Sequence, residues 1–285
     1  MARYKLENEL IEIEVDEHGA ELKSLVRKDN CTQYMWNADP KYWGRTSPVL
    51  FPFVGAVKDG TYHTKGKSYS MGQHGFARDM DFSLSDKTAD TLWFELKSND
   101  ITLEKYPYEF LFRIGYRIES NKVTVIWHVE NIGSEILPFS VGGHPAFNNR
   151  KNSKLLFDVD GSIKSRTLVN GLAGDEIETI PLNKSFLDVT KKLFDKDALV
   201  IENQSIHKVS LCEESGEAYL TLTADCPLMG IWSPVGSDVP FVCIEPWYGR
   251  CDSIHFDGEL SEREYGNLLN PNESWEREYT IEAVK

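Results

Sequence analysis

Apolar and polar residues alternate along several stretches of this chain, and the alternation constrains the fold more than any other feature of the sequence. In residues 110–118 every second side chain is apolar and the intervening positions include two arginines. Residues 123–129 repeat the pattern after a short polar segment. A period of two is typical of antiparallel strands that bury one face. The two stretches therefore predict a β-hairpin.

Strand-like stretches occur along the whole chain, whereas helical patterns are few and short. We expect further strands in residues 11–15, 91–97, 207–212, 218–224, 241–244 and 276–283. Helical turns are expected in residues 104–106 and 261–268. Strands without intervening helices of about 10–15 residues argue against a βαβ fold and favour a sandwich or barrel. Because no internal repeat or flexible linker interrupts the pattern, the sequence predicts an all-β fold in a single domain, residues 1–285.

Charge and cysteine content exclude several classes of partner. Acidic residues number 45 against 31 basic ones, the formal charge is -14, and no run is rich in Lys or Arg, so we expect no nucleic-acid partner. No stretch approaches the roughly 18 apolar residues of a membrane span, and the N-terminus lacks an apolar leader, so no membrane association is expected. Five cysteines without C-x-x-C spacing indicate neither a disulfide framework nor a zinc site. A cytoplasmic location follows from these features.

Three segments, residues 73–79, 141–148 and 243–249, break the alternation and concentrate reactive side chains. Each surrounds a titratable residue with Gly, Pro or aromatic residues, as in functional loops carried by a rigid scaffold. The histidines of the first two segments can equally be ordinary turn residues. Glu245 follows an apolar run and precedes Pro-Trp, so burial is expected to raise its pKa into the range of a general base.

Other chemistries have little support in the sequence. It contains no G-x-S-x-G elbow, P-loop, G-x-G-x-x-G or H-E-x-x-H motif. His74 and His144 lack the short spacing of metal-ligand pairs, so we expect no metal and no other cofactor. A glycoside hydrolase needs two carboxylates about 5–9.5 Å apart, and Glu245 alone has a site-like setting.

Taken in order, the motifs His-Gly-Phe-Ala-Arg at 74–78, Gly-Gly-His-Pro-Ala-Phe at 142–147 and Glu-Pro-Trp at 245–247 resemble those of the aldose 1-epimerase, or galactose mutarotase, superfamily. The likeness spans nearly the whole chain and is greatest to the branch of lactose-operon mutarotase-like proteins of Gram-positive bacteria. It implies a large antiparallel β-supersandwich, which agrees with the alternation.

The resemblance also implies roles for individual residues. His144 matches the general acid of the family and Glu245 its general base. His74 matches a second histidine that binds the sugar near its ring oxygen and C1 hydroxyl. Arg78 lies in the same motif as His74 and is a candidate either for substrate binding or only for an ion pair with Asp79. The ring of Trp247 can stack on the sugar.

Two family features have no clear counterpart. The arginine that follows the first motif in galactose mutarotases is absent, since Ala56 stands in the corresponding Gly-Ala-Val-Lys stretch. Arg45 or Lys58 are candidate replacements. The family aspartate that contacts sugar hydroxyls has Asp197 as its candidate here, with Asp195 as the alternative.

The sequence therefore predicts a mutarotase that interconverts the α and β anomers of a hexose by acid–base ring opening. Two alternatives remain: a non-catalytic carbohydrate-binding or sensing protein on the same scaffold, and a hexose-6-phosphate epimerase. The expected partner is a small-molecule monosaccharide, and the chain is expected to be a monomer or homodimer.

Overall fold

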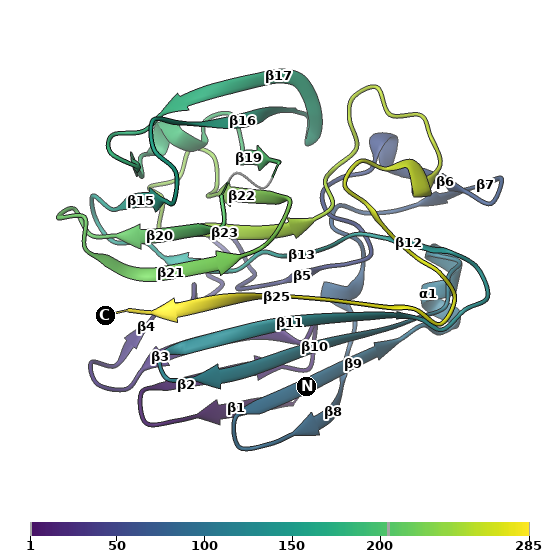
Figure 1. Cartoon of the computed structure of the whole chain (residues 1–285), viewed down its shortest axis with the longest axis horizontal. Coiled ribbons are helices and arrows are strands. Elements are labelled where there is room, and N and C mark those ends of the chain that lie inside the picture. Colours follow the sequence, from purple (N-terminus) through teal and green to yellow (C-terminus); the bar gives the residue numbers. More distant parts are fainter. Residues whose placement is uncertain (1, 204–205, 285) are drawn as a thin grey trace.

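Two large antiparallel sheets dominate the computed structural model, which describes residues 2–203 and 206–284 (Figure 1). Within these residues the first sheet has nine strands, in the order β18 (Phe186–Asp188), β15 (Lys154–Phe157), β20 (Lys208–Cys212), β21 (Ala218–Ala224), β25 (Ser274–Ala283), β11 (Lys122–Asn131), β10 (Phe110–Glu119), β9 (Thr91–Lys97) and β8 (Ser83–Lys87). The second orders β17 (Leu172–Pro181), β16 (Ser162–Val169), β19 (Leu199–Glu202), β22 (Leu228–Trp232), β23 (Phe241–Tyr248), β13 (Val141–Gly143) and β5 (Val49–Leu50), with β14 (Ala146–Asn148) also paired to β23.

Smaller elements surround these sheets. One further sheet contains β1 (Arg3–Glu7), β2 (Ile11–Asp16), β3 (Glu21–Arg27) and β4 (Thr32–Gln33). Two hydrogen-bonded pairs join β12 (Leu137–Phe139) to β24 (Asn267–Leu269), and β6 (Thr61–Thr64) to β7 (Lys67–Ser70). Helical structure in the described residues is limited to α1 (Asp100–Lys105) and short 3₁₀ turns at Lys58–Gly60, Ala77–Asp79, Lys191–Phe194 and Leu260–Glu262. None of these helices is long and apolar enough to cross a membrane.

The two large sheets pack face to face through aromatic side chains. Trp127 of β11 is 1% exposed, and its ring centroid lies 6.2 Å from that of Tyr248 of β23. Tyr279 of β25 approaches Gly143 so closely that a Cβ there would lie 3.1 Å from the tyrosine hydroxyl. The inward faces of both sheets therefore share one core, as expected for a sandwich.

The predicted all-β supersandwich is confirmed, and so is the hairpin within it. β10 and β11 pair from Phe110 opposite Asn131 to Glu119 opposite Lys122, leaving a two-residue turn. Ser120 in that turn has a left-handed φ of 54°, which suits the turns that join twisted strands. The strands expected in residues 11–15, 91–97, 207–212, 218–224 and 276–283 are also present, with ends shifted by at most two residues.

The helical predictions fare less well. Residues 104–106 overlap only the end of α1, which begins earlier because Asn99 and Thr102 form a capping box. The helix predicted for residues 261–268 is wrong. A single 3₁₀ turn ends at Glu262, Tyr265 has a φ of 60°, and the following residues form β24 against β12. A left-handed residue ends a right-handed helix, and pairing with a distant strand outweighs the local preference.

Candidate active site

Glu245 lies in the middle of β23, a strand in which all eight residues are buried. β22 pairs along one edge of β23, and β13 and β14 pair along the other. Because both faces of this strand are covered, its sequence shows no alternation. The sequence predicts loops at 141–148 and 243–249, and this prediction is wrong, because most of these residues belong to β13, β14 and β23.

His144 faces Glu245 across a break in this sheet. β13 pairs with residues 247–248 of β23, and β14 pairs with residues 241–243. The register is the same on both sides of the break, so it places His144, between β13 and β14, opposite Glu245. The two side chains meet with His144 Nε2 and Glu245 Oε2 3.3 Å apart.

Prolines explain why the ladder is interrupted at this point. Pro145 and Pro246 have no amide hydrogen and cannot donate to a neighbouring strand. The His144 amide instead donates to the Pro48 carbonyl at 3.2 Å. The imidazole is thereby held beside the strand that carries the carboxylate, on a backbone that is itself hydrogen-bonded.

His74 lies beside His144, and its protonation can be assigned from its contacts. Its Nδ1 accepts the Gly55 amide hydrogen at 3.1 Å, and its own amide donates to the Gly55 carbonyl at 2.9 Å. An imidazole that accepts at Nδ1 carries its hydrogen on Nε2. The ring lies edge-on to His144, with centroids 5.6 Å apart. His74 therefore offers an N–H donor from its Nε2.

Two tryptophans hold the imidazole of His144. Trp43 stacks on it, with ring centroids 4.7 Å apart, and Trp232 meets it edge-on at 5.6 Å. Such contacts restrict ring rotation and exclude water from one side of the ring. The His144 side chain is only 10% exposed.

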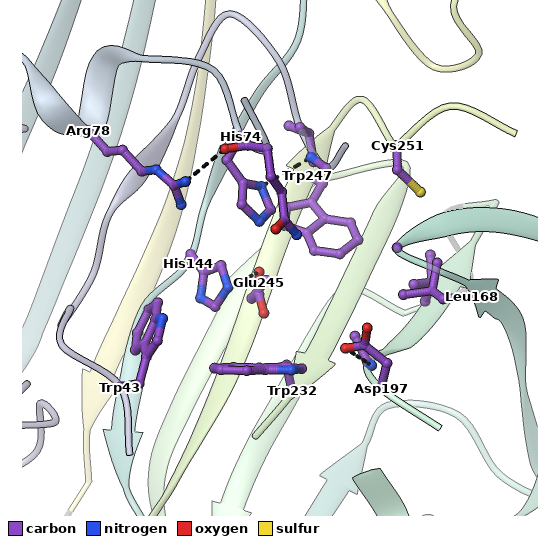
Figure 2. A pocket seen from close by; sticks show the side chains of 16 residues that line it. Trp43, His74, Arg78, His144, Leu168, Asp197, Trp232, Glu245, Trp247 and Cys251 are labelled. Carbon is purple, nitrogen blue, oxygen red and sulfur yellow. Dashed lines mark hydrogen bonds and ion pairs between the residues drawn. The ribbon is translucent and has the colours of Figure 1, made fainter. Parts of the chain in front are cut away.

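Trp247 lies two residues beyond Glu245 and therefore on the same face of β23. Its indole fits only because the neighbouring strands carry glycine. A Cβ at Gly142 would lie 2.7 Å from the indole, and a Cβ at Gly230, opposite Glu245, would lie 2.5 Å from it. Figure 2 shows Trp247 and Trp232 on either side of the carboxylate.

The facing pair forms part of the wall of a cavity of about 280 Å³ (Figure 2). This size is near the lower end of the range for small-molecule sites. The lining combines aromatic, aliphatic and polar side chains: Trp43, Val54, Gly55, Gln73, His74, Arg78, His144, Leu168, Gly171, Asp197, Ala198, Val200, Trp232, Glu245, Trp247 and Cys251. An apolar cavity with a few convergent polar groups is the usual form of a binding site.

Burial shifts the protonation equilibria of the pair in opposite directions. It lowers the pKa of His144 to about 3 and lowers the pKa of His74 well below its usual value. Burial raises the pKa of Glu245 well above its usual value; the Trp247 indole opposes this rise and the charge of Asp197 adds to it. Both shifts favour a neutral imidazole beside a protonated carboxyl group over an ion pair.

The model of the family described as aldose 1-epimerase matches residues 2–281. The chain belongs to the aldose 1-epimerase family. It is 28% identical to the LacX proteins of Lactococcus lactis over 294 residues, which cover 97% of this chain and 98% of theirs.

Two solved structures resemble the epimerase along its whole length. A galactose mutarotase-related enzyme of Lactobacillus acidophilus has 33% identity and a TM-score of 0.94, covering 100% of this chain and 98% of that one. A galactose mutarotase-like protein of Lactobacillus casei has 30% identity and a TM-score of 0.93, covering 99% of each chain. The epimerase is accordingly an isomerase of carbohydrate metabolism.

Most of the site residues predicted for the epimerase lie together in the cavity, and Arg45 does not. His74, Arg78, Asp197 and Trp247 line it with the facing pair. The Arg45 guanidinium donates to Asp79 at 2.8 Å and is not part of the lining. The predicted substrate contact of Arg45 stays a prediction: its guanidinium pairs with Asp79, and its charge contributes to lowering the pKa of both His74 and His144.

The other candidate replacement for the family arginine, Lys58, is also outside the cavity lining. Its backbone N–H donates to the Asp252 carboxylate at 2.8 Å. Arg78 takes the position of a cavity cation instead. It donates to the Gln73 carbonyl at 2.7 Å, and its Nε is buried without a hydrogen-bond partner in the described part of the chain.

Sequence reasoning missed several residues of the lining. Trp43, Trp232, Leu168, Val200 and Cys251 come from separate parts of the chain and share no motif. An aromatic pair at 42–43 beside a Gly-Arg was the one available signal for Trp43. Tertiary packing alone brings the others to the cavity.

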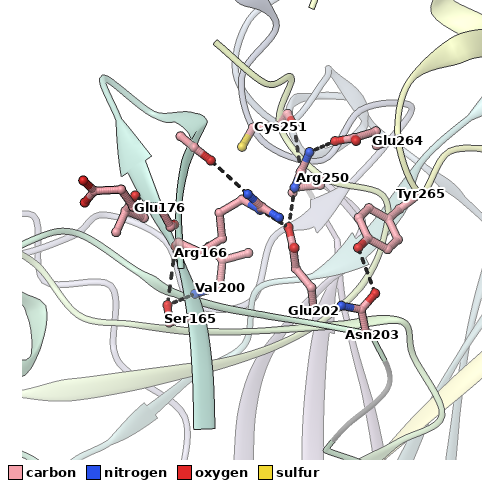
Figure 3. A network of polar contacts seen from close by, with 12 residues as sticks. Ser165, Arg166, Glu176, Val200, Glu202, Asn203, Arg250, Cys251, Glu264 and Tyr265 are labelled. Atoms are coloured by element: carbon pink, nitrogen blue, oxygen red, sulfur yellow. Dashed lines mark hydrogen bonds and ion pairs between the residues drawn. The ribbon is translucent and has the colours of Figure 1, made fainter. Parts of the chain in front are cut away.

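A partly buried ion-pair network lies next to the cavity wall formed by Val200 and Cys251 (Figure 3). Glu202, at the end of β19, accepts from Arg166 Nε at 2.8 Å and also from Arg250. Arg250 in turn pairs with Glu264. The network joins β16 and β19 to the segment that follows β23.

Proposed function

We propose that this epimerase is a mutarotase that interconverts the α and β anomers of a hexose, with His144 as general acid and Glu245 as general base. One observation carries the proposal: a buried imidazole and a buried carboxylate face each other at 3.3 Å in the wall of a cavity of monosaccharide scale. Ring opening requires a proton to leave the C1 hydroxyl while another reaches the ring oxygen. A facing acid and base supply both transfers, each typically contributing about 10²–10⁴-fold.

The pair needs one proton in total for this chemistry. With the cyclic sugar, protonated His144 gives its proton to the ring oxygen while ionised Glu245 takes the proton of the C1 hydroxyl. The C1–O5 bond breaks, and the pair is left as neutral imidazole and protonated carboxyl. Rotation about C1–C2 followed by the reverse transfers closes the opposite face of the aldehyde.

The neutral form of the pair that accompanies the open-chain aldehyde is the form that burial favours. It differs from the ion pair only by the position of one proton across the 3.3 Å gap. The site can therefore reset without exchanging protons with bulk water. Burial therefore favours the state reached on ring opening, in which neither His144 nor Glu245 is charged.

His74 and the tryptophans position the sugar in this proposal. The Nε2–H of His74 donates to the ring oxygen or the C1 hydroxyl, beside the proton that His144 delivers. Trp232 and Trp247 flank Glu245, and their rings provide apolar surface for the faces of the pyranose. Asp197, across the cavity, accepts from a sugar hydroxyl.

The lining favours an uncharged hexose over a hexose 6-phosphate. Arg78 is the one arginine or lysine that lines the cavity in the described part of the chain, and its guanidinium already donates to Gln73. Phosphate recognition usually employs several charge-assisted hydrogen bonds, which the single guanidinium of Arg78 does not supply. A cytoplasmic location is part of the proposal; all five cysteines are free thiols, as a reducing compartment requires.

Anomer equilibration measures this activity directly. Freshly dissolved α-galactose, α-glucose and glucose 6-phosphate would be followed by polarimetry or NMR with the wild type, with Glu245→Gln, and with Glu95→Gln as a strand carboxylate of the other sheet. We expect the wild type and Glu95→Gln to accelerate equilibration of a free hexose and Glu245→Gln to lose the acceleration. A wild type that accelerates none of the three sugars rejects the mutarotase and favours the binding or sensing alternative. Equal rates for Glu245→Gln and wild type would remove Glu245 as the base.

A further inference from the structure

A cysteine completes a group of potential metal ligands around the facing pair. One ligand atom from each of His144, Cys243 and Glu245 lies within 4.8 Å of the others, and all three residues are buried. Cys243 precedes Glu245 by two positions in β23, so both side chains leave the strand on the face toward His144. Imidazole nitrogen, thiolate sulfur and carboxylate oxygen are together the donor set that zinc accepts.

The donors are not committed to other partners. Glu245 is 1% exposed, and its Oε2 makes no hydrogen bond within residues 2–203 and 206–284 although His144 Nε2 lies 3.3 Å away. Among the described residues the Cys243 thiol makes no hydrogen bond either, whereas the equally buried Cys226 thiol donates to the Leu228 carbonyl at 3.0 Å. A cation at this point would satisfy a buried carboxylate oxygen that is otherwise unpartnered.

The geometry is close to what a metal needs. Zinc bonds of about 2.0–2.3 Å in a tetrahedral arrangement place the ligand atoms roughly 3.3–3.7 Å apart. The imidazole and the carboxylate already meet this spacing, and the group as a whole must contract by roughly 1 Å. Two of the three ligands line the cavity, so an ion can enter from it and keep its fourth position open toward it.

We propose that His144, Cys243 and Glu245 form a binding site for a thiophilic divalent cation of the Zn²⁺ class, and that occupation of this site blocks the sugar site. On binding, metal–sulfur and metal–oxygen bonds replace the S–H bond of Cys243 and the O–H bond of Glu245, and both protons pass to the buffer. The carboxylate and the imidazole contribute lone pairs, and no electron is transferred. The blocking effect rests on the proposed function of the pair, whereas the binding does not.

Cobalt spectroscopy tests the binding without any substrate. Reduced, chelator-treated protein would be titrated with Co²⁺, and the thiolate-to-cobalt charge-transfer absorption followed in the near ultraviolet. We expect the band to grow to one equivalent in the wild type and in Cys226→Ala, and to be absent in Cys243→Ala and Cys243→Ser. Absence of the band in the wild type, or its persistence in either folded Cys243 variant, overturns the proposal. The wild-type titration decides by itself if both variants fail to fold.

Inhibition tests the blocking effect separately. Zn²⁺ is expected to raise the apparent KM for the sugar, and Cys243→Ala is expected to need at least about tenfold more Zn²⁺ for the same effect, since loss of a ligand weakens a metal site by at least the 10–100-fold typical of supporting residues. A charge-transfer band without any mutarotation leaves the metal site standing and rejects the proposed function. Mutarotation without the charge-transfer band supports the proposed function and rejects the metal site. Equal Zn²⁺ sensitivity of Cys243→Ala and wild type rejects the blocking effect.

Discussion

Two buried carboxylates of the eight-stranded sheet have opposite surroundings. Glu202, whose side chain is 6% exposed, accepts from two arginines, and these contacts lower its pKa against the effect of burial. Glu245, 1% exposed, faces a neutral imidazole and, among the residues that the structure describes, pairs with no arginine or lysine, so burial raises its pKa. The first arrangement stabilises a charge that stays in place. The second keeps a proton ready to move, which is what an acid–base site requires.

The largest effect expected from this difference is on catalysis. Glu245→Gln preserves the shape of the side chain but removes the proposed base, and we expect the rate of anomer equilibration to fall by about 10²–10⁴-fold. Glu202 is not among the residues that line the cavity. Glu202→Gln should therefore change kcat by at most about threefold, much less than the loss of a general base would. Polarimetry of both variants at matched concentration measures the ratio. Comparable rate losses in the two variants would show that the different surroundings of Glu245 and Glu202 do not determine which carboxylate acts in catalysis.

For the free energy of unfolding we expect a large effect from Glu202→Gln, the variant that changes catalysis least. Glu202→Gln leaves Arg166 and Arg250 without their shared carboxylate, and breaking a buried ion pair on one side costs about 3–5 kcal/mol of unfolding free energy. Denaturant unfolding followed by circular dichroism measures the loss. Glu202→Gln unfolding at the wild-type midpoint would mean that the network in Figure 3 contributes nothing to the folded state.

A smaller effect is the pH dependence of the difference in unfolding free energy between wild type and Glu245→Gln. The folded pKa of Glu245 is raised above its unfolded value of about 4.3, so its contribution is fully present below pH 4.3 and is lost as the pH rises toward the folded pKa. The loss is about 1.4 kcal/mol for each pH unit in this window. Glu245→Gln should therefore gain stability relative to wild type as the pH rises above about 4.3. A constant difference would show that burial does not govern this carboxyl group.

For Glu202 the sign of the pH effect is reversed. Its folded pKa is lowered, so its contribution is present above about pH 4.3 and is lost as the pH falls through the folded value. The destabilisation of Glu202→Gln relative to wild type should thus shrink in acid. This provides the matched control for Glu245, measured on the same unfolding curves.

The smallest expected effects concern two aromatic rings, one beside the His144–Glu245 pair and one beside the Glu202 network. Trp43→Leu removes the ring stacked on His144, and we expect kcat/KM to fall by about two- to tenfold, equivalent to roughly 0.5–1.5 kcal/mol. Tyr265→Leu removes the ring 5.5 Å from the Arg250 guanidinium and should lower stability by about 0.5–1 kcal/mol while leaving kcat/KM unchanged. Steady-state kinetics together with thermal unfolding separates the two. Equal effects on activity would show that Trp43 acts only through general packing.

Local patterns predicted the parts of the fold that depend on neighbouring residues. The hairpin of β10 and β11 follows from alternation and a two-residue turn, both of which are set within 22 residues. Residues 261–268 show the limit of such reasoning. Their helical composition yields to the left-handed Tyr265 and to pairing with β12, more than a hundred residues away in the chain.

The sequence by itself determined the strand pattern and, through three short motifs, singled out His144 and Glu245 as candidate site residues. Their meeting was decided by the tertiary structure, because strand register across about 100 residues places one opposite the other. Tertiary packing likewise pairs Arg45 with Asp79, outside the cavity lining, and places Trp43 against the imidazole of His144. A period of two is a property of the extended backbone and is visible in the chain, whereas burial and facing depend on which strands pair. The opposite pKa shifts of His144 and Glu245 come from that burial.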